Sequence, residues 1–514
     1  MLVPAHQNYV RISCMAKVFR NKTILQILDH YRDFWSLSYA AGVLGWDLKT
    51  YMPKGGATPR GVALGRISTI QQRLFLSKDF VSLVHQASVE KNLTDAEKGV
   101  VRVLLHQLRF FEKIPPKFLE DFSLLTSEAS VVWRNAKEKE DYKLFEPYLK
   151  RIFDSNRKMA EYLGYKDSPY DALLDLFEEG LTVGDVEPFF DSIRKPLKTL
   201  LSQIVKSDKY NNSHFLEEQA YNKGKLERLN LKILKLLFED SSRLRLDVSS
   251  HPFTTSFSRS DTRITTWYHR NDFARSLLAV IHEFGHALYD LQADPGLEMT
   301  PIQGGTSLVI HESQSRFWEN FVGRSDEFLL GYLIDFKGLS KPIGRYIDVE
   351  KIKGLRMYFN KVSPGALRVE ADEVTYHFHI MLRYEIEKEI MEGRLKIKDL
   401  REIWNTKMKN YLGINPRKDS EGVLQDIHWS MGNVGYFPTY SLGTFLGAQW
   451  EQQIKSSKLK INNYEEIKKW LRLHIHQYGS TYTMSDLLKK NKMKFDPEVN
   501  LRYLREKYGK IYGF

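Results

Sequence analysis

Cysteine is almost absent from this chain. Its 514 residues include a single cysteine, Cys14. One cysteine excludes an internal disulfide, a cysteine-based zinc ribbon and any chemistry that needs two thiols. A metal or catalytic site in this chain must therefore be built from other side chains.

Long apolar runs are also missing. The chain has no run of about eighteen consecutive apolar residues, which a membrane-spanning helix requires. Its first residues lack the apolar core of a secretory signal. We therefore expect a cytoplasmic protein that has no membrane partner.

The first residues show no organised pattern. The helical apolar pattern begins only near Thr23, and a second methionine, Met15, precedes it. We expect residues 1–22 to be a disordered N-terminal extension, with either Met1 or Met15 as the true start. No repeat, low-complexity segment or long linker divides the remainder, so we expect a single domain over 23–514.

Positive charge exceeds negative charge, giving a formal net charge of +12. Basic residues gather near the C-terminus, over 455–460 and 489–494. Such groups occur in nucleic-acid interfaces, but Glu465, Glu466 and Asp496 are interspersed and no nucleic-acid-binding module is recognisable. We interpret these groups as solvated helix faces and expect no nucleic-acid partner. Abundant lysine and glutamate, with no cysteine beyond the extension, indicate a thermostable protein.

Apolar residues recur with the helical period over most of the chain. Thr94 and Glu97 have the spacing of a capping box, and Gly45 is expected to end the first helix. We predict helices over 23–45, 60–76, 94–114, 116–138, 142–163, 168–178, 183–206, 222–238, 306–320, 325–335, 344–358, 366–392, 397–411, 440–455, 463–477, 483–490 and 497–508.

A different pattern precedes residue 276. Residues 254–258 and 263–268 are short, β-branched and aromatic, and a polar turn separates them, so we predict a β-hairpin. The fold class is therefore mainly α, with a small β-sheet directly before the next helix. Gly285 lies inside that helix, where we expect it to allow close packing against the sheet.

The helix after this hairpin carries two histidines four residues apart. His282 and His286, with Glu283 between them, form an HExxH pattern, and the i, i+4 spacing places both imidazoles on one helix face. Asn271 or Asp272 is expected to cap this helix. Two imidazoles on one face can bind a metal ion without strain.

A hydrolytic metal site usually has three protein ligands and an open position for water. Glu312, on the helix predicted over 306–320, completes the set, and Glu283 is placed to take a proton from water. A histidine on an apolar helix face is more commonly a core residue, and HExxH also arises by chance. The combination with Glu312 favours a metal site over these alternatives.

Several further motifs accompany the HExxH pattern in a fixed order. They are Trp46-Asp-Leu-Lys-Thr-Tyr-Met-Pro53, His251-Pro-Phe253, Asp261-Thr-Arg-Ile-Thr265, His311-Glu-Ser-Gln314, Leu367-Arg-Val-Glu-Ala-Asp372 and Gly422-Val-Leu-Gln-Asp-Ile-His-Trp429. With them the chain resembles the carboxypeptidase Taq family of thermostable metallocarboxypeptidases over nearly its full length. Leu367 departs conservatively from the family pattern, at an apolar position.

The resemblance implies a large helical fold with a deep groove, shared with neurolysin-like and angiotensin-converting-enzyme-like peptidases. It implies release of single amino acids from free peptide C-termini with broad specificity. It also implies one zinc ion for each chain, with cobalt as the other metal, and a homodimer.

A carboxypeptidase must recognise the terminal carboxylate, and the planar fork of arginine suits this task. Arg368 is the first candidate and Arg263 the second. The alternative for each is a structural ion pair, Arg368 with Asp372 and Arg263 with Asp261. His251 is either a groove residue or part of the framework, and we favour the framework.

An oxyanion in the reaction needs a hydrogen-bond donor besides the metal. His428, followed by Tyr436 and Tyr440, resembles the histidine and tyrosine of the wider peptidase class, although aromatic residues here could simply fill the core. Tyr440 is a candidate for substrate binding. We expect the ion to polarise the scissile carbonyl and acidify water, Glu283 to act as general base, and His428 with Tyr436 to steady the oxyanion.

Two other functions stay open at this point. The nearest is an oligopeptidase that cuts inside short peptides with the same metal chemistry. The other is an inactive, basic helical protein that binds nucleic acid. His377 and His379 are interpreted as helix-face or interface residues rather than as ligands.

Overall fold

The computed structural model describes residues 18–333 and 349–514. Contacts between residues divide the chain into two compact units, each assembled from three stretches. The first unit comprises Met1–Leu108, Phe215–Arg356 and Trp450–Lys494, and the second comprises Arg109–His214, Met357–Gln449 and Phe495–Phe514. The single domain expected over 23–514 stays a prediction, and residues 1–17 of the expected extension lie outside the described residues.

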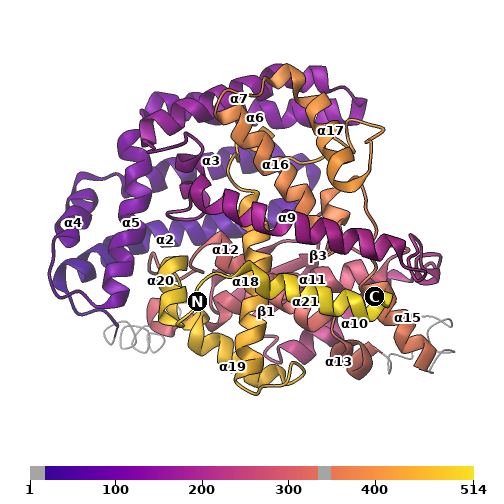
Figure 1. The fold of residues 1–514 in the computed structure, drawn as a ribbon. Helices are drawn as coiled ribbons and strands as arrows, with labels where there is room; N and C mark the ends of the chain where they lie inside the picture. The colour runs from indigo at the N-terminus through magenta and orange to yellow at the C-terminus, as the bar shows by residue number, and fades with distance from the viewer. Residues whose placement is uncertain (1–17, 334–348) are drawn as a thin grey trace. The chain divides into compact units, whose positions relative to one another are not determined.

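Helices dominate the described residues (Figure 1). Their bounds are α2 Lys22–Lys49, α3 Ala57–Phe75, α4 Lys78–Ser88, α5 Asp95–Lys113, α6 Pro116–Lys139, α7 Tyr142–Leu163, α8 Asp171–Phe177, α9 Val183–Lys206, α10 Lys223–Leu237, α11 Phe273–Gln292, α12 Leu308–Arg316, α13 Asp326–Phe328, α15 Val349–Phe359, α16 Tyr376–Met391, α17 Leu400–Leu412, α18 Pro438–Ser456, α19 Tyr464–His474, α20 Met484–Lys490 and α21 Pro497–Tyr512.

Local sequence signals placed most of these helices correctly. The bounds of α7 and α9 match the predicted 142–163 and 183–206. The capping box that begins α5 is confirmed, since the Glu97 amide donates to Thr94 Oγ1 at 3.3 Å and the Thr94 amide donates to Glu97 Oε2 at 2.8 Å. Such signals are readable because a cap and its helix lie within one turn of each other.

Other helix predictions need correction. The first helix does not end at Gly45 but continues as α2 to Lys49, and α4 was not predicted at all. Residues 334–348 lie outside the described residues, so the helices predicted over 325–335 and 344–358 are described only in part. Leu329–Leu333 within the first of them is π-helical.

The helix predicted over 366–392 begins only at Tyr376. The Asp372 side chain accepts hydrogen bonds from the Val374 amide, the Thr375 amide and the Thr375 hydroxyl, at 2.7–2.9 Å. A carboxylate that binds the amides just beyond it stabilises a turn in place of a continuous helix. The preceding part of the segment contains a short 3₁₀ turn, Arg368–Glu370.

The sheet of the first unit has three strands in the order β1-β3-β2. They are β1 Leu244–Val248, β2 Thr254–Ser258 and β3 Asp261–Thr266. β2 and β3 form the predicted antiparallel hairpin, whereas β1 pairs in parallel with β3 and was not predicted. Both hairpin strands pack against α11, and Phe257 and Ile264 are buried. The predicted fold class, mainly α with a small sheet beside this helix, is confirmed.

Gly285 packs against a different element from the one predicted. A Cβ atom on this residue would lie 2.6 Å from the carbonyl oxygen of Gln314 and 2.6 Å from Cα of Ser315. The close approach is therefore to α12 and not to the sheet. Glycine costs roughly 1 kcal/mol relative to alanine inside a helix, and here it lets two helix backbones come together.

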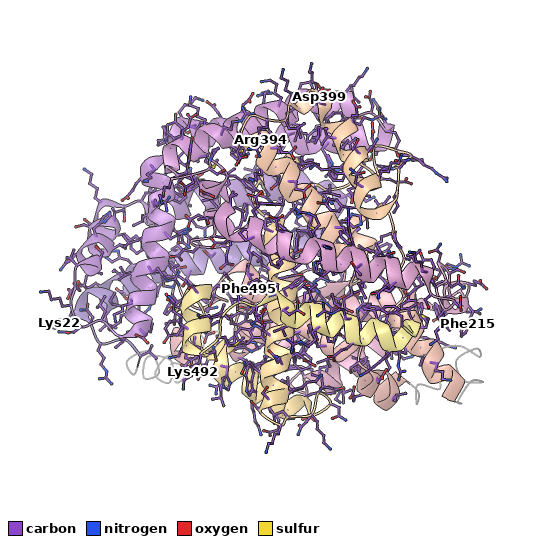
Figure 2. All side chains as sticks on the ribbon, in the orientation of Figure 1. Lys22, Phe215, Arg394, Asp399, Lys492 and Phe495 are labelled. Carbon is purple, nitrogen blue, oxygen red and sulfur yellow. The ribbon has the colours of Figure 1, made fainter. Side chains whose placement is uncertain are left out.

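Charged side chains cover the surfaces of both units. Lys22 and Lys492 are exposed on the first unit, and Arg394 and Asp399 on the second (Figure 2). Exposed C-terminal lysines pair with acidic residues three or four positions away: Lys455 with Glu451, Lys469 with Glu466, and Lys489 with Asp486. None of the described helices combines the length and the apolar composition needed to cross a lipid bilayer.

A fully buried carboxylate, Glu387, lies on α16 in the second unit. Its oxygens accept hydrogen bonds from the Tyr170 hydroxyl, from Trp429 Nε1 at 2.6 Å and from the Gly435 amide at 2.9 Å. Burial raises the pKa of Glu387 to about 7, although these donors and Arg383 oppose the rise.

This raised pKa predicts that Glu387 makes the stability of the protein depend on pH. The folded-state pKa lies above the ordinary value of 4.5, so the contribution of this group is fully present below about pH 4.5 and is lost as pH rises toward 7. The loss amounts to about 3 kcal/mol. Urea unfolding of the wild type and of Glu387→Gln at pH 5 and pH 8 checks this. The variant should lose that part of the pH dependence, and equal pH dependence in both proteins would contradict the assignment.

Candidate metal centre

Two adjacent helices of the first unit bring three metal-binding side chains together. His282 and His286 lie on α11, which Asp272 caps by accepting from the Arg275 amide. Glu312 lies on α12, and its Oε2 atom is 3.8 Å from His282 Nε2 and 3.6 Å from His286 Nε2. The structure thus assembles all three predicted ligands into one group.

The geometry of this group fits a metal ion. A tetrahedral zinc ion with ligands at about 2.0–2.1 Å holds the ligand atoms about 3.3–3.5 Å apart. The separations of 3.6 and 3.8 Å between carboxylate and imidazole atoms are close to that value. Two imidazole nitrogens and one carboxylate oxygen are also the donor set of hydrolytic zinc sites.

Glu312 is held in its ionised form. Burial alone would raise the pKa of this carboxyl, but Arg316 and the two histidines hold it well below its usual range. Arg316 Nε donates to Glu312 Oε1 at 2.7 Å, which leaves Oε2 directed at His282 and His286. The carboxylate is therefore both charged and oriented for metal binding.

Glu319 orients one of the histidines. His282 Nδ1 lies 2.9 Å from Glu319 Oε2, so His282 donates there and keeps the lone pair of Nε2 for the metal. Arg316 and Arg324 donate to Glu319 at 3.0 and 3.1 Å. Burial would raise the pKa of Glu319, but Arg316 and the other partners hold it well below its usual range.

Glu319 is not among the residues predicted from the sequence, although a signal was present. Glu319 follows Glu312 by seven residues, which is two helical turns and therefore the same face. Residues Phe317–Gly323 continue α12 as a π-helix in place of the predicted α-helical end.

The second histidine is oriented by another histidine. His286 Nδ1 lies 3.0 Å from His311 Nδ1, and His286 must donate in this pair for its Nε2 to carry a lone pair toward the metal. His311 Nε2 lies 3.7 Å from Asp290 Oδ1. Asp290 thus lies beside His311, the partner of His286.

Glu283, the predicted base, lies on α11 between the two histidines. It is buried, and its Oε2 accepts from Thr254 Oγ1 at 2.6 Å. The same hydroxyl lies 3.0 Å from the carbonyl oxygen of Glu283. The first residue of β2 therefore fixes this carboxylate, a role for Thr254 that the sequence did not reveal.

Arg263 and His251 lie on and next to the sheet. Arg263 forms two hydrogen bonds with Asp261, at 2.9 and 3.0 Å, and its guanidinium lies over the rings of Trp46 and Phe257. The ion-pair alternative for Arg263 is thus present in the structure. The His251 side chain is exposed, and its carbonyl oxygen accepts from the Ser249 hydroxyl.

The remaining predicted residues form one group in the second unit, which we call the aromatic cluster: Arg368, His428, Tyr436 and Tyr440. His428 Nε2 lies 3.3 Å from the Tyr440 hydroxyl. The Tyr436 ring centre is 5.4 Å from that of His428 and 5.1 Å from that of Tyr440. Arg368 lies over the Tyr440 ring, 5.2 Å from its centre.

Asp426 forms an ion pair with Arg368, the charged residue of this cluster. Its carboxylate accepts from Arg368 at 2.8 and 3.0 Å and also from Arg383. The ion-pair partner of Arg368 is therefore Asp426 and not Asp372, which is engaged in its own turn. Burial lowers the pKa of His428 to about 4, so this imidazole is neutral near pH 7. His377 and His379 are buried on α16, and the group of metal-binding side chains found among the described residues does not include them.

Two histidines and a glutamate that converge on a metal position, with a buried glutamate beside them, define a metal-dependent hydrolase. Comparison with known proteins gives the family. The model of the carboxypeptidase Taq (M32) metallopeptidases matches residues 26–508. The chain belongs to this family, and the predicted fold class and enzyme class, a metallocarboxypeptidase, are confirmed.

Relatives match the chain over almost its whole length. Thermostable carboxypeptidase 1 of Pyrococcus furiosus is 47% identical over 96% of this chain and 100% of its own. Carboxypeptidase 1 of Bacillus subtilis is 35% identical over 95% of this chain and 97% of its own. A solved structure of the Pyrococcus furiosus carboxypeptidase has a TM-score of 0.92, with 47% identity over 96% of this chain and 100% of that one.

Two substitutions separate metal binding from proton transfer. Glu312→Ala should lose the metal, because two imidazoles then remain. Glu283→Gln should keep the metal and lose turnover, because an amide cannot take a proton. Metal content by mass spectrometry and kcat on a peptide substrate check both, and normal turnover in either variant would refute its assignment.

Glu319→Gln should weaken metal binding without abolishing it. The glutamine amide accepts a weaker hydrogen bond from His282, and it lacks the negative charge that pairs with Arg316 and Arg324. Loss of such a partner typically costs about 10–100-fold in metal affinity. Competition with a chelator measures this, with Glu327→Gln as a control in the same segment. An unchanged affinity would show that Glu319 does not support His282.

Proposed function

We propose that this protein releases single amino acids from the free C-termini of peptides with broad specificity. The observation that carries the proposal is the group of His282, His286 and Glu312, with Glu283 buried beside it. Family membership supports a carboxypeptidase over both the oligopeptidase and the nucleic-acid-binding alternatives.

The metal we propose is one zinc ion for each chain, with cobalt as the other candidate. When bound, the ion polarises the scissile carbonyl and lowers the pKa of water. His282, His286 and Glu312 would hold it through the nitrogen and oxygen atoms described above. Their nitrogen and oxygen donors also accept other divalent metals, so metal supply helps decide which is bound.

The proton steps fall to Glu283. Its carboxylate takes a proton from the attacking water and returns it to the leaving amine. Thr254 donates to one of its oxygens and so fixes the direction in which the carboxylate acts. No covalent bond between enzyme and substrate is needed.

We propose that His428 and Tyr436 steady the oxyanion and that Tyr440 orients His428. A neutral His428 has one N–H to donate, and the Tyr440 hydroxyl 3.3 Å from its Nε2 atom helps to select which nitrogen carries the proton. Loss of one such donor to an oxyanion typically costs about 10²–10³ in rate.

The candidates for binding the terminal carboxylate are Arg368 and Arg263, whereas His251 stays a candidate for the groove or the framework. Arg368 already donates to Asp426 and to the Tyr376 hydroxyl, which favours a structural role for it. Arg263 uses Nε and Nη2 for Asp261, whereas its Nη1 makes no hydrogen bond with the described residues. That free edge keeps Arg263 as a candidate for carboxylate binding.

We also propose that the protein is a thermostable homodimer located in the cytoplasm. The family resemblance supports a homodimer. A chain with one cysteine has no internal disulfide, which is typical of proteins in the reducing cytoplasm and supports that location. A relative at 47% identity bears the name of a thermostable carboxypeptidase, which supports thermostability of this chain.

Mass spectrometry of peptide products tests the proposed reaction. An unmodified peptide should give a ladder of products, each shorter by one C-terminal residue, with enzyme reloaded with zinc or cobalt and not with metal-free enzyme. The same peptide with an amidated C-terminus should resist, because it lacks the carboxylate. Internal fragments from both peptides would instead establish the oligopeptidase, and intact peptides under every metal would refute peptidase activity.

A further inference from the structure

The buried carboxylate Glu387 binds two residues that flank the proposed oxyanion donors. Trp429, which donates to Glu387 Oε1 at 2.6 Å, directly follows His428. Gly435, whose amide donates to Oε2 at 2.9 Å, directly precedes Tyr436. One carboxylate therefore holds the first and the last residue of the segment 429–435 that separates the two donors.

The rest of this segment is also tightly confined. Gly435 has a φ of +101°, and a Cβ atom there would lie 2.8 Å from the backbone of Leu173. Gly432 has a φ of +79°, and a Cβ atom there would lie 2.5 Å from the Phe122 ring. Neither position has room for a side chain, and Glu387 accepts a hydrogen bond from each end of the segment.

We infer that Glu387 is a positioning residue for catalysis, because it fixes the geometry of His428 and Tyr436 through their neighbours Trp429 and Gly435. The inference rests on the proposed role of His428 and Tyr436 as oxyanion donors. No atom of Glu387 needs to touch the substrate. Buried hydrogen bonds to two points of one loop are directional, and they restrict the loop more than packing alone.

Replacement by glutamine keeps the size of this side chain but not its hydrogen bonds. A carboxylate offers two acceptor oxygens, and here they serve three donors from Tyr170, Trp429 and Gly435. Glutamine has one acceptor oxygen, and its NH₂ group would face a donor. The segment then loses at least one of its two anchors, so His428 and Tyr436 should no longer share one fixed arrangement.

The experiment compares Glu387→Gln with Glu385→Gln. Glu385 lies on the same helix, but its carboxylate serves Arg194, Lys407 and Tyr411 and no residue of the segment. With a peptide substrate, well below the melting temperature of each variant, Glu387→Gln should lower kcat at least about tenfold, with KM and metal content within about twofold of wild type. The control should keep its kcat. An unchanged kcat in Glu387→Gln would overturn the inference.

A double-mutant cycle separates positioning from a merely structural role. In this cycle His428→Gln and Tyr436→Phe together count as one change. If Glu387 acts through these two donors, adding Glu387→Gln to the variant that already lacks both should lower kcat no further. Independent losses that multiply would contradict the inference. Trp429→Phe removes one anchor alone, and a smaller loss of kcat is expected from it. If Glu387→Gln does not fold, Trp429→Phe replaces it as the test. Wild-type kcat in Trp429→Phe would then refute the inference.

The same series distinguishes failure of this inference from failure of the proposed function. Wild-type kcat in both His428→Gln and Tyr436→Phe would refute the oxyanion role itself and the positioning role that depends on it. Reduced kcat in those variants together with normal kcat in Glu387→Gln and in Trp429→Phe would refute only the positioning role of Glu387.

Discussion

The metal centre depends on how closely α11 and α12 approach each other. Glu312 must lie within 3.6–3.8 Å of both imidazoles, and Gly285 permits this because α12 occupies the space where a Cβ atom would be. A functional site must be held to within about 0.5 Å of its productive geometry. A side chain at this crossing would push the helices apart by more than that, so the proposed ligands come together because position 285 is a glycine.

Around that crossing the protein keeps several charges in a buried region. Unpaired buried carboxylates are costly, and paired ones are tolerated when hydrogen bonds satisfy their oxygens. Arg316 pairs with both Glu312 and Glu319, and Arg324 pairs with Glu319. One arginine thus links the ligand to the residue that orients His282. In the second unit one buried aspartate, Asp426, likewise pairs with two residues of opposite charge, Arg368 and Arg383. Each unit therefore organises its polar residues around buried ion pairs that fix side-chain directions.

The sequence was most informative where one helical turn carries the signal. The pair His282 and His286, the cap at Asp272 and the capping box of α5 all lie within four residues, and each was found in the structure. Assignments that required knowing which element lies beside a helix were less successful. Gly285 packs against α12 and not the sheet, and Arg368 pairs with Asp426 and not with the aspartate one turn away. Helical periodicity shows which residues face the core, but not which neighbour fills the space.

By itself the sequence determined the helical class, the hairpin and the group of His282, His286 and Glu312 that the structure brings together, because helix spacing and a fixed order of motifs carry these features. The tertiary structure alone decided which side chains orient them. Thr254 beside Glu283, His311 beside His286 and Glu387 beside the segment 429–435 are separated from their partners by 25 residues or more along the chain. Hydrogen bonds over such separations follow from the packing of whole elements, which no local pattern in the sequence specifies.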